Sequence, residues 1–348
     1  MKFKKLFIFI LVILFKTGNV LSNENIFNVN NIEIIKKKNM NNQELAQLAI
    51  KYGFEELKKK ILLDEDQKKL SKLNNSQIID LMSYYQVVKK KDEITNIEKM
   101  NFNIFFDKKK LHDLFYKEGI FYSEIGNKEI YTLPILKKDD QFYVYNKNFF
   151  YENWNEIHQD DQIEFILPLE NIEIFQKINS NKNNLLSLSL NDFFQEYTNK
   201  NLALIFIEET NSKNERIFLK MKILGKNINK NLLIKKENLN KDEFNSKIIE
   251  TVKKEIKKIV KTENLIDVRT PSFLNTKIRI DKKNNLAELN KRLKEIDTIE
   301  NIFVQKFNNE HMFIKIKYLG RLDKIINQLN NEKIRLDLQG EEWSLKIL

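Results

Sequence analysis

The sequence predicts an α+β fold with mixed and antiparallel sheets, packed helices and a ferredoxin-like βαββαβ unit at its C-terminal end. Segments in which apolar residues alternate, as in half-buried strands, are interspersed with segments in which they recur at helical spacing. From residue 271 onward these segments follow the order βαββαβ, with one more strand after it. The 348 residues include only 7 Gly and 3 Pro, which excludes low-complexity linkers and collagen-like repeats.

The first 22 residues have the three parts of a secretory signal peptide. A basic start leads to an unbroken apolar run over Leu6–Phe15, and a polar stretch follows over Lys16–Ser22. Ten apolar residues are too few to span a bilayer, which needs about 20. Val20 and Ser22 suit the −3 and −1 positions of a cleavage site, so we expect cleavage after Ser22 and a periplasmic or secreted protein. An uncleaved anchor or a buried strand is the alternative.

The first predicted domain covers residues 23–180 and alternates strands with helices. Asp107 directly precedes one of the helices and is placed to cap it, and Gly119 suits its left-handed end. The expected helices are Gln43–Leu62, with Asn41–Asn42 as its cap, Ser76–Tyr84, Lys109–Glu118, Asn148–Gln159 and Asn171–Ile178. The expected strands are Phe27–Ile35, Gln86–Val88, Ile94–Phe106, Glu129–Leu136, Phe142–Tyr145 and Ile163–Leu167.

The middle predicted domain, 181–270, follows a polar run at residues 179–184. The continuous apolar segment Leu202–Glu208 suits the centre of a sheet that is covered on both faces. A helix is expected over Leu190–Thr198, and a long amphipathic helix over about Asp242–Lys261. Its neighbouring strands are expected at Arg216–Leu224 and Asn231–Lys236.

The last predicted domain, 271–348, is the ferredoxin-like unit. Its expected strands are Asn275–Asp281, Glu300–Phe307, Met312–Tyr318, Ile334–Leu338 and Glu342–Ile347. Its expected helices are Leu286–Ile296 and a segment marked by Leu322, Ile325, Ile326 and Leu329. Because this fold hosts many functions, it identifies none of them.

An ordered set of short motifs resembles the bacterial domain-of-unknown-function family 2066. The motifs are the helix QELAQLAIKYGFEEL, the loop and helix LNNSQIIDLMSYYQV, the step NFNIFFDKKKLHDLFYKEGI with Phe106, Asp107 and Gly119, the strand Leu133–Leu136, the segment Asn148–Trp154, and Leu167–Leu169. The resemblance covers roughly residues 25–225, and the turn near Gly320 is similar as well. It departs from the family pattern at Phe149 and Phe150, which replace a Pro and a Trp. The resemblance implies a secreted protein of this architecture and implies no reaction.

Composition removes several kinds of chemistry. The absence of Cys excludes disulfides, thiolate metal sites and a cysteine nucleophile. His112, His158 and His311 are too far apart in sequence to form a local zinc motif, and no phosphate loop, dinucleotide fingerprint or nucleophile-elbow motif occurs. We therefore predict no catalytic, cofactor-binding or metal site, and no cofactor.

The net charge of +11 does not indicate a nucleic-acid partner. Only six of the 60 basic residues are Arg, the side chain that grips phosphate with a planar fork, and part of the charge belongs to the signal peptide. Isolated polar candidates are expected to have structural roles. Asp107 reads as a helix cap, Asp139–Asp140 and Asp160–Asp161 as solvated turns, and the three histidines as surface or boundary side chains.

Two surfaces remain as contact candidates. Phe149, Phe150 and Trp154 form either an aromatic platform for sugars or peptides or part of the core. Lys247, Lys254, Lys258 and Lys261 line one face of the long helix and form either a contact for anionic headgroups or an ordinary solvated face.

We expect a non-catalytic envelope protein that binds another envelope protein or a cell-wall component. The alternatives are a peripheral membrane binder that uses the lysine face and an unrecognised hydrolase that uses paired carboxylates.

Overall fold

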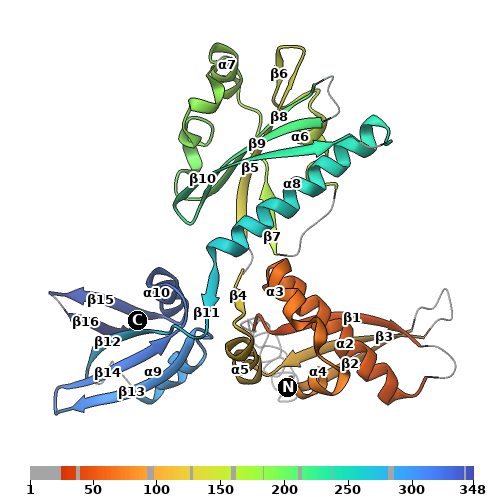
Figure 1. The fold of residues 1–348 in the computed structure, drawn as a ribbon. Coiled ribbons are helices and arrows are strands. Elements are labelled where there is room, and N and C mark those ends of the chain that lie inside the picture. Colours follow the sequence, from red (N-terminus) through yellow and green to blue (C-terminus); the bar gives the residue numbers. More distant parts are fainter. Residues whose placement is uncertain are drawn as a thin grey trace, which may run out of the picture. The chain divides into compact units, whose positions relative to one another are not determined.

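The chain forms two compact units in a computed structural model, Met1–Tyr122 with Leu265–Leu348, and Ser123–Asn264 (Figure 1). The structure describes residues 25–36, 40–91, 98–125, 128–157, 162–182, 184–210, 214–236, 238–280, 286–340 and 342–348. The predicted signal peptide, His158, Asp160 and Asp161 lie outside these residues. The α+β class is confirmed.

The first unit begins with a three-stranded sheet of order β1-β3-β2, in which β3 is antiparallel to both neighbours. Its strands are β1 (Asn28–Ile35), β2 (Met82–Lys91) and β3 (Glu98–Phe106), and its helices are α2 (Asn42–Ile61), α3 (Asp64–Lys69), α4 (Asn75–Asp80) and α5 (Lys108–Glu118), with a 3-10 turn η1 (Leu70–Lys72). Phe102, Ile104 and Phe106 are buried, which confirms the predicted alternation. The Asn41 side chain caps α2 as predicted, by accepting a hydrogen bond from the Glu44 N–H.

The same unit contains a five-stranded sheet of order β13-β14-β12-β16-β15. Its elements are β12 (Ser272–Arg279), α9 (Leu286–Lys294), β13 (Ile299–Phe307), β14 (His311–Tyr318), α10 (Leu322–Asn331), β15 (Ile334–Gln339) and β16 (Glu342–Ile347). The predicted order βαββαβ plus one strand is confirmed. The extra strand β16 lies inside the sheet, parallel to β12 and antiparallel to β15, so it separates the two strands that a plain ferredoxin-like sheet places side by side.

The two sheets of the first unit share one local design. In each, two parallel strands flank an antiparallel third, and a helical segment connects the parallel pair: β1 and β2 flank β3, and β12 and β13 flank β14. A short two-stranded pair, β4 (Phe121–Ser123) with β11 (Leu265–Asp267), completes this unit where the chain leaves and returns.

The second unit is a six-stranded sheet covered by helices on both faces. Its strand order is β10-β9-β8-β5-β6, and β7 also pairs with β5. The strands are β5 (Lys128–Lys138), β6 (Gln141–Tyr143), β7 (Ile163–Ile166), β8 (Asn201–Glu208), β9 (Asn214–Ile223) and β10 (Lys226–Lys235), and the helices are α6 (Phe149–Asn153), α7 (Ile172–Ser180) and α8 (Lys241–Glu263).

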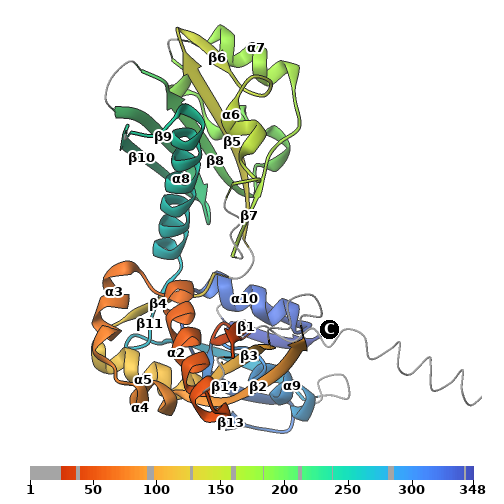
Figure 2. The same cartoon turned by 90° about the vertical axis from the view of Figure 1, so that its right-hand side faces the viewer.

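Side chains of β8 pack in both directions, as predicted for Leu202–Glu208. Ala203, Ile205 and Ile207 face α8, whereas Leu202 and Leu204 face α7. The long α8 runs along one sheet face (Figure 2). Most side chains of β8 are buried because helices cover both faces of the sheet at this strand.

The predicted domain boundary at 180/181 is wrong, because it falls inside the second unit. Ile178 and Leu185, on either side of the polar run 179–184, belong to the same core cluster as Leu202 and Leu204. The run is a surface loop between elements that share a core, and a polar loop reports exposure rather than a division between domains. The structure divides the chain after Tyr122 and after Asn264 instead, so residues 271–348 share a unit with the first 122 residues.

Three predicted helices are shorter than expected. The helix expected over Ser76–Tyr84 ends at Asp80, because β2 already begins at Met82 and pairs with β3. The helix expected over Asn148–Gln159 is limited to α6. The segment Leu190–Thr198 forms two 3-10 turns, η3 (Leu190–Asp192) and η4 (Gln195–Tyr197), which bury Phe193 and Phe194 without a full helix.

Candidate functional site

The second unit has a pocket at the carboxyl ends of its parallel strands β5 and β8. The pocket encloses about 300 Å³, and Leu136 of β5 and Ile207 of β8 form part of its lining. The first turns of α8 and the segment that follows β10 complete it. The pocket therefore combines chain segments that are far apart in sequence.

The topology explains why a crevice lies at this place. From β5 the chain passes through α6 to β7 on one side of β5, and then through α7 to β8 on the other side. Phe150 of α6 packs in the core on the α8 face, whereas Ile174 and Ile178 of α7 pack on the opposite face. In open α/β sheets, ligands bind at the carboxyl ends of strands where successive connections switch faces.

The floor of the pocket is apolar. Phe150, Phe244 and Ile248 are 2%, 6% and 1% exposed, so the floor that they form is part of the hydrophobic core. Leu239, at 39% exposure, lies at the solvent side. Such a surface favours an apolar group over a fully hydrated ion.

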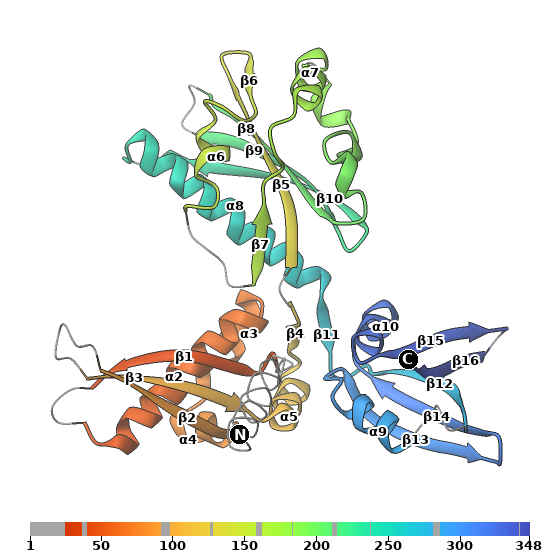
Figure 3. The ribbon, with the colours of Figure 1, turned by 180° about the vertical axis from the view of Figure 1, so that it is seen from behind.

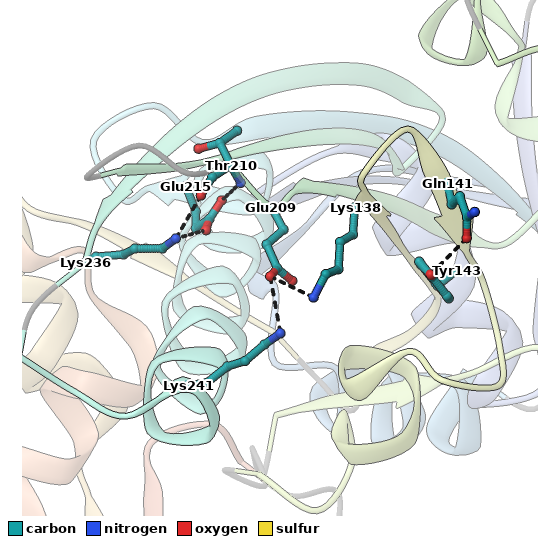
Figure 4. A network of polar contacts seen from close by, with 8 residues as sticks. All are labelled: Lys138, Gln141, Tyr143, Glu209, Thr210, Glu215, Lys236 and Lys241. Carbon is teal, nitrogen blue, oxygen red and sulfur yellow. Dashed lines mark hydrogen bonds and ion pairs between the residues drawn. The ribbon is translucent and has the colours of Figure 1, made fainter.

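One carboxylate at the rim is shared by two lysines. The ammonium groups of Lys138 and Lys241 both lie 3.2 Å from Oε1 of Glu209 (Figure 4). Partial burial favours the neutral form of Glu209, but the hydrogen bonds from Lys241 and Lys138 outweigh it and hold the pKa of Glu209 below its ordinary value. Glu209 is therefore ionised at neutral pH.

A second ion pair closes the other side of the rim. Glu215, whose side chain is 4% exposed, has its Oε1 2.7 Å from the ammonium group of Lys236. Its other carboxylate oxygen accepts a hydrogen bond of 2.9 Å from the backbone N–H of Thr210. These contacts join the start of β9 to the segments after β8 and β10 (Figure 4).

The rim carboxylate Glu209 does not have the raised pKa of a general acid. Every resolved pKa shift of a described Asp or Glu is downward, at Asp192, Glu209, Asp267, Glu288 and Glu300. A catalytic acid needs a raised pKa instead. Among the residues that the structure describes, no group of three or more His, Asp or Glu could hold a metal ion.

Of the two alternatives for the aromatic segment, burial in the core applies to two of its three residues. Trp154 is fully buried and Phe150 nearly so, and Trp154 packs edge-on against Phe165 at a ring distance of 5.9 Å. The ammonium group of Lys253 lies 5.7 Å from the centre of the Trp154 ring. Phe149 is partly buried against the same core. The segment is therefore part of the core, as the second alternative proposed. Phe150 also lines the floor of the pocket.

The predicted lysine face is incomplete. Lys254 and Lys258 are exposed and Lys247 is half-buried, but Lys261 is only 6% exposed. Lys261 lies in the last turn of α8, where the apolar and polar faces are no longer separated. The exposed Glu250 further divides the basic positions.

The isolated polar candidates have the following places. Asp107 caps α5 as predicted by accepting a hydrogen bond from the Lys110 N–H, and Asp139 and Asp140 lie in an exposed turn. His311 is half-buried beside Glu310. His112 is 8% exposed, so it is buried rather than at the surface or boundary position that was expected.

Sequence reasoning missed the rim residues Glu209, Glu215, Lys138, Lys236 and Lys241. One signal was available, because Glu209 directly follows the apolar strand predicted at Leu202–Glu208, and ligands bind at such strand ends. The lysine partners carry no local signal, since their positions depend on the turn after β5 and on the packing of α8.

None of the helices in the described ranges is long and apolar enough to cross a membrane. Comparisons with protein-family models, curated proteins and solved structures give no match for this chain, so the resemblance to domain-of-unknown-function family 2066 stays a prediction.

Proposed function

We propose that this is a non-catalytic binding protein of the cell envelope, whose pocket receives an apolar side chain of a partner protein. The observation that carries the proposal is the pocket itself, with an apolar floor and an ion-paired rim, at the carboxyl ends of β5 and β8. The predicted signal peptide supports the compartment.

The size of the pocket favours one anchoring side chain. About 300 Å³ accommodates a large apolar side chain and is at the lower end of small-molecule sites. Full burial of one Leu or Phe side chain stabilises a complex by about 1.5–3 kcal/mol. Further contacts must come from the rim, where Lys241 and Leu239 are accessible to a bound segment.

Site-specific photo-crosslinking tests the proposal. A photoreactive amino acid replaces Leu239 at the pocket or, as a control, Leu233, which lies on β10 and is 70% exposed. We expect a discrete partner band from position 239 and none from position 233 in envelope extracts. The two positions giving the same bands would contradict the proposal.

A variant with a filled pocket sharpens this test. Asn245→Trp places a bulky ring in the pocket, whereas Lys254→Trp places it on an exposed part of the same helix. The crosslink from position 239 should disappear with Asn245→Trp and persist with Lys254→Trp. Its persistence in both variants would show that the pocket is not the binding site.

Peripheral membrane binding is the second candidate, because Lys254 and Lys258 are exposed one turn apart on α8. It predicts sedimentation with anionic liposomes at low salt that is lost when both lysines are replaced by Gln. No sedimentation of the unmodified protein at low salt would eliminate it.

A further inference from the structure

The five-stranded sheet of the first unit has one face that its helices do not cover. Leu274, Ile278, Ile314 and Ile316 point to the face that packs in one core cluster with α9 and α10. Residues that alternate with them on β12 and β14 point to the opposite face. The neighbouring strands β13, β14 and β12 can be followed in Figure 3.

This second face displays phenylalanines to solvent. Phe273 on β12 is 51% exposed, Phe303 on β13 is 46% exposed, and Phe313 on β14 is half-buried. Phe303 lies directly opposite Lys315 in the strand register, so the rings and ammonium groups share one surface. Exposed rings gathered on a sheet are typical of interaction surfaces.

Lysines lie against two of these rings. The ammonium group of Lys315 is 4.3 Å from the centre of the Phe273 ring, and that of Lys306 is 5.8 Å from the centre of the Phe313 ring. Lys317 lies opposite Phe273 in the register. None of the paired positions of β12, β13 and β14 on this face is Asp or Glu: 273, 275, 277, 279, 301, 303, 306, 311, 313, 315 and 317. One carboxylate lies at the edge of this set, because Glu300 at the irregularity of β13 interacts electrostatically with Lys317. Glu300 also pairs with Lys108 and His112.

Acidic residues nearby have other partners. Glu342 on β16 has a carboxylate oxygen 3.1 Å from Lys277, and Asp337 on β15 has one 2.8 Å from Arg335. The surface formed by Phe273, Phe303, Phe313, Lys306, Lys315 and Lys317, here called the Phe-Lys face, is therefore positively charged and aromatic at once.

We propose that the Phe-Lys face binds an anionic glycan of the cell envelope. The apolar faces of sugar rings pack on the phenyl rings, and carboxylate or phosphate groups of the glycan pair with the lysines. Charge complementarity selects an acidic partner, and the aromatic rings select a partner that itself contains rings. The choice of an envelope glycan rests on the envelope location of the proposed function, which the predicted signal peptide supports.

The alternatives differ in one property each. An acidic polypeptide without aromatic residues has the charge but not the rings, and a neutral glycan has the rings but not the charge. Single-stranded nucleic acid has both, and its bases stack on aromatic side chains of sheets. Among the paired positions of β12, β13 and β14 on this side of the sheet, Lys277, Lys306, Lys315 and Lys317 outnumber the single Arg, Arg279, whereas bidentate phosphate recognition favours Arg. We therefore favour the glycan.

Four fluorescent polymers separate these partners in anisotropy titrations at low salt. They are polygalacturonate, neutral dextran, polyglutamate and single-stranded oligothymidylate. We expect polygalacturonate to bind at least about tenfold more tightly than dextran and polyglutamate, and its binding to weaken as salt is added. If polyglutamate bound as tightly as polygalacturonate, the surface would recognise negative charge alone, and the proposal would be overturned. Tighter binding of oligothymidylate would also overturn it, in favour of nucleic acid.

Matched variants locate the binding. Phe303→Ala and Lys315→Ala alter the Phe-Lys face, whereas Phe307→Ala and Lys291→Ala change exposed residues of the same types on the other side of the sheet. Each of the first two should weaken polygalacturonate binding by about threefold or more, because Phe303→Ala removes a ring on which a sugar packs and Lys315→Ala removes a partner of its carboxylates. The controls should stay within about twofold of the unmodified protein. Equal losses in both sets would show that the glycan binds elsewhere.

Discussion

His112 on α5 and Glu300 on β13 form a contact between the two sheets of the first unit. Nδ1 of His112 lies 3.2 Å from Oε1 of Glu300, and Lys108 lies 3.6 Å from the same oxygen. Lys108 also donates a hydrogen bond to the backbone carbonyl of Asp297. The other ring nitrogen of His112, Nε2, is buried with no hydrogen-bond partner among the described residues. Among the described residues, the polar contact of the His112 ring is therefore the one that its Nδ1 makes with Glu300.

This contact makes the stability of the first unit depend on pH. The hydrogen bond from His112 lowers the pKa of Glu300 from its ordinary 4.5, burial opposes it, and the charges of His112, Lys108 and Lys317 add to the lowering. A carboxylate with a lowered folded-state pKa stabilises the fold above its unfolded-state pKa, and the contribution is lost as the pH falls through the folded-state value.

Glu300→Gln is therefore expected to lower the free energy of unfolding by about 1 kcal/mol at pH 7, and by less as the pH is lowered to 3. Urea denaturation at the two pH values measures the difference. Glu310→Gln is the control, because Glu310 is 84% exposed and lies 3.9 Å from His311. An equal effect of Glu300→Gln at both pH values would show that ionisation is not involved.

Replacing Lys236 should destabilise the second unit. Lys236→Met leaves the buried carboxylate of Glu215 without the cation that neutralises it, although the Thr210 N–H still donates a hydrogen bond to it (Figure 4). We expect a loss of about 2 kcal/mol of unfolding free energy. The double variant Glu215→Gln with Lys236→Met should recover part of this loss, since no charge is then buried. Thermal denaturation of Lys236→Met, of Glu215→Gln and of the double variant measures these losses. If the double variant were as unstable as the sum of the singles, the pair would not be coupled.

Gly53 should resist replacement although it lies inside α2. A Cβ atom at this position would lie 3.0 Å from Cγ1 of Ile104, whose side chain is fully buried. The gain in helix propensity of about 1 kcal/mol from Ala is then offset by overpacking of about 1–3 kcal/mol. We expect Gly53→Ala to lower the melting temperature, whereas Lys51→Ala, at an exposed position of the same helix, should leave it nearly unchanged. A higher melting temperature for Gly53→Ala would contradict this prediction.

Removing the Asp107 cap should weaken α5. The Asp107 side chain accepts a hydrogen bond of 3.0 Å from the Lys110 N–H, so Asp107→Ala should cost about 1 kcal/mol of unfolding free energy. Asp107→Asn should retain most of it, because the amide oxygen still accepts the bond. Asp113→Ala, at an exposed position in the same helix, is the control. Chemical denaturation with the three variants side by side gives the answer.

The sequence by itself determined the features that depend on neighbouring residues. The caps at Asn41 and Asp107, the left-handed end at Gly119 and the buried strand Leu202–Glu208 were all predicted, and the structure has them. Each rests on hydrogen bonds or apolar alternation within a few residues, so the local pattern suffices. The α+β class and the order of elements in the last part of the chain follow from the same patterns.

Only the tertiary structure decided which distant segments meet. It brought Glu209 between Lys138 and Lys241 and placed β16 between β12 and β15. It also buried Lys261, which was expected on the lysine face of the long helix, and His112, which was expected at the surface or boundary. These outcomes depend on sheet pairing and on the direction in which each connection crosses the sheet. Many residues together determine the strand pairing and the crossing directions, and no local sequence pattern shows them. The pocket and the Phe-Lys face therefore emerge only when the strands are assembled.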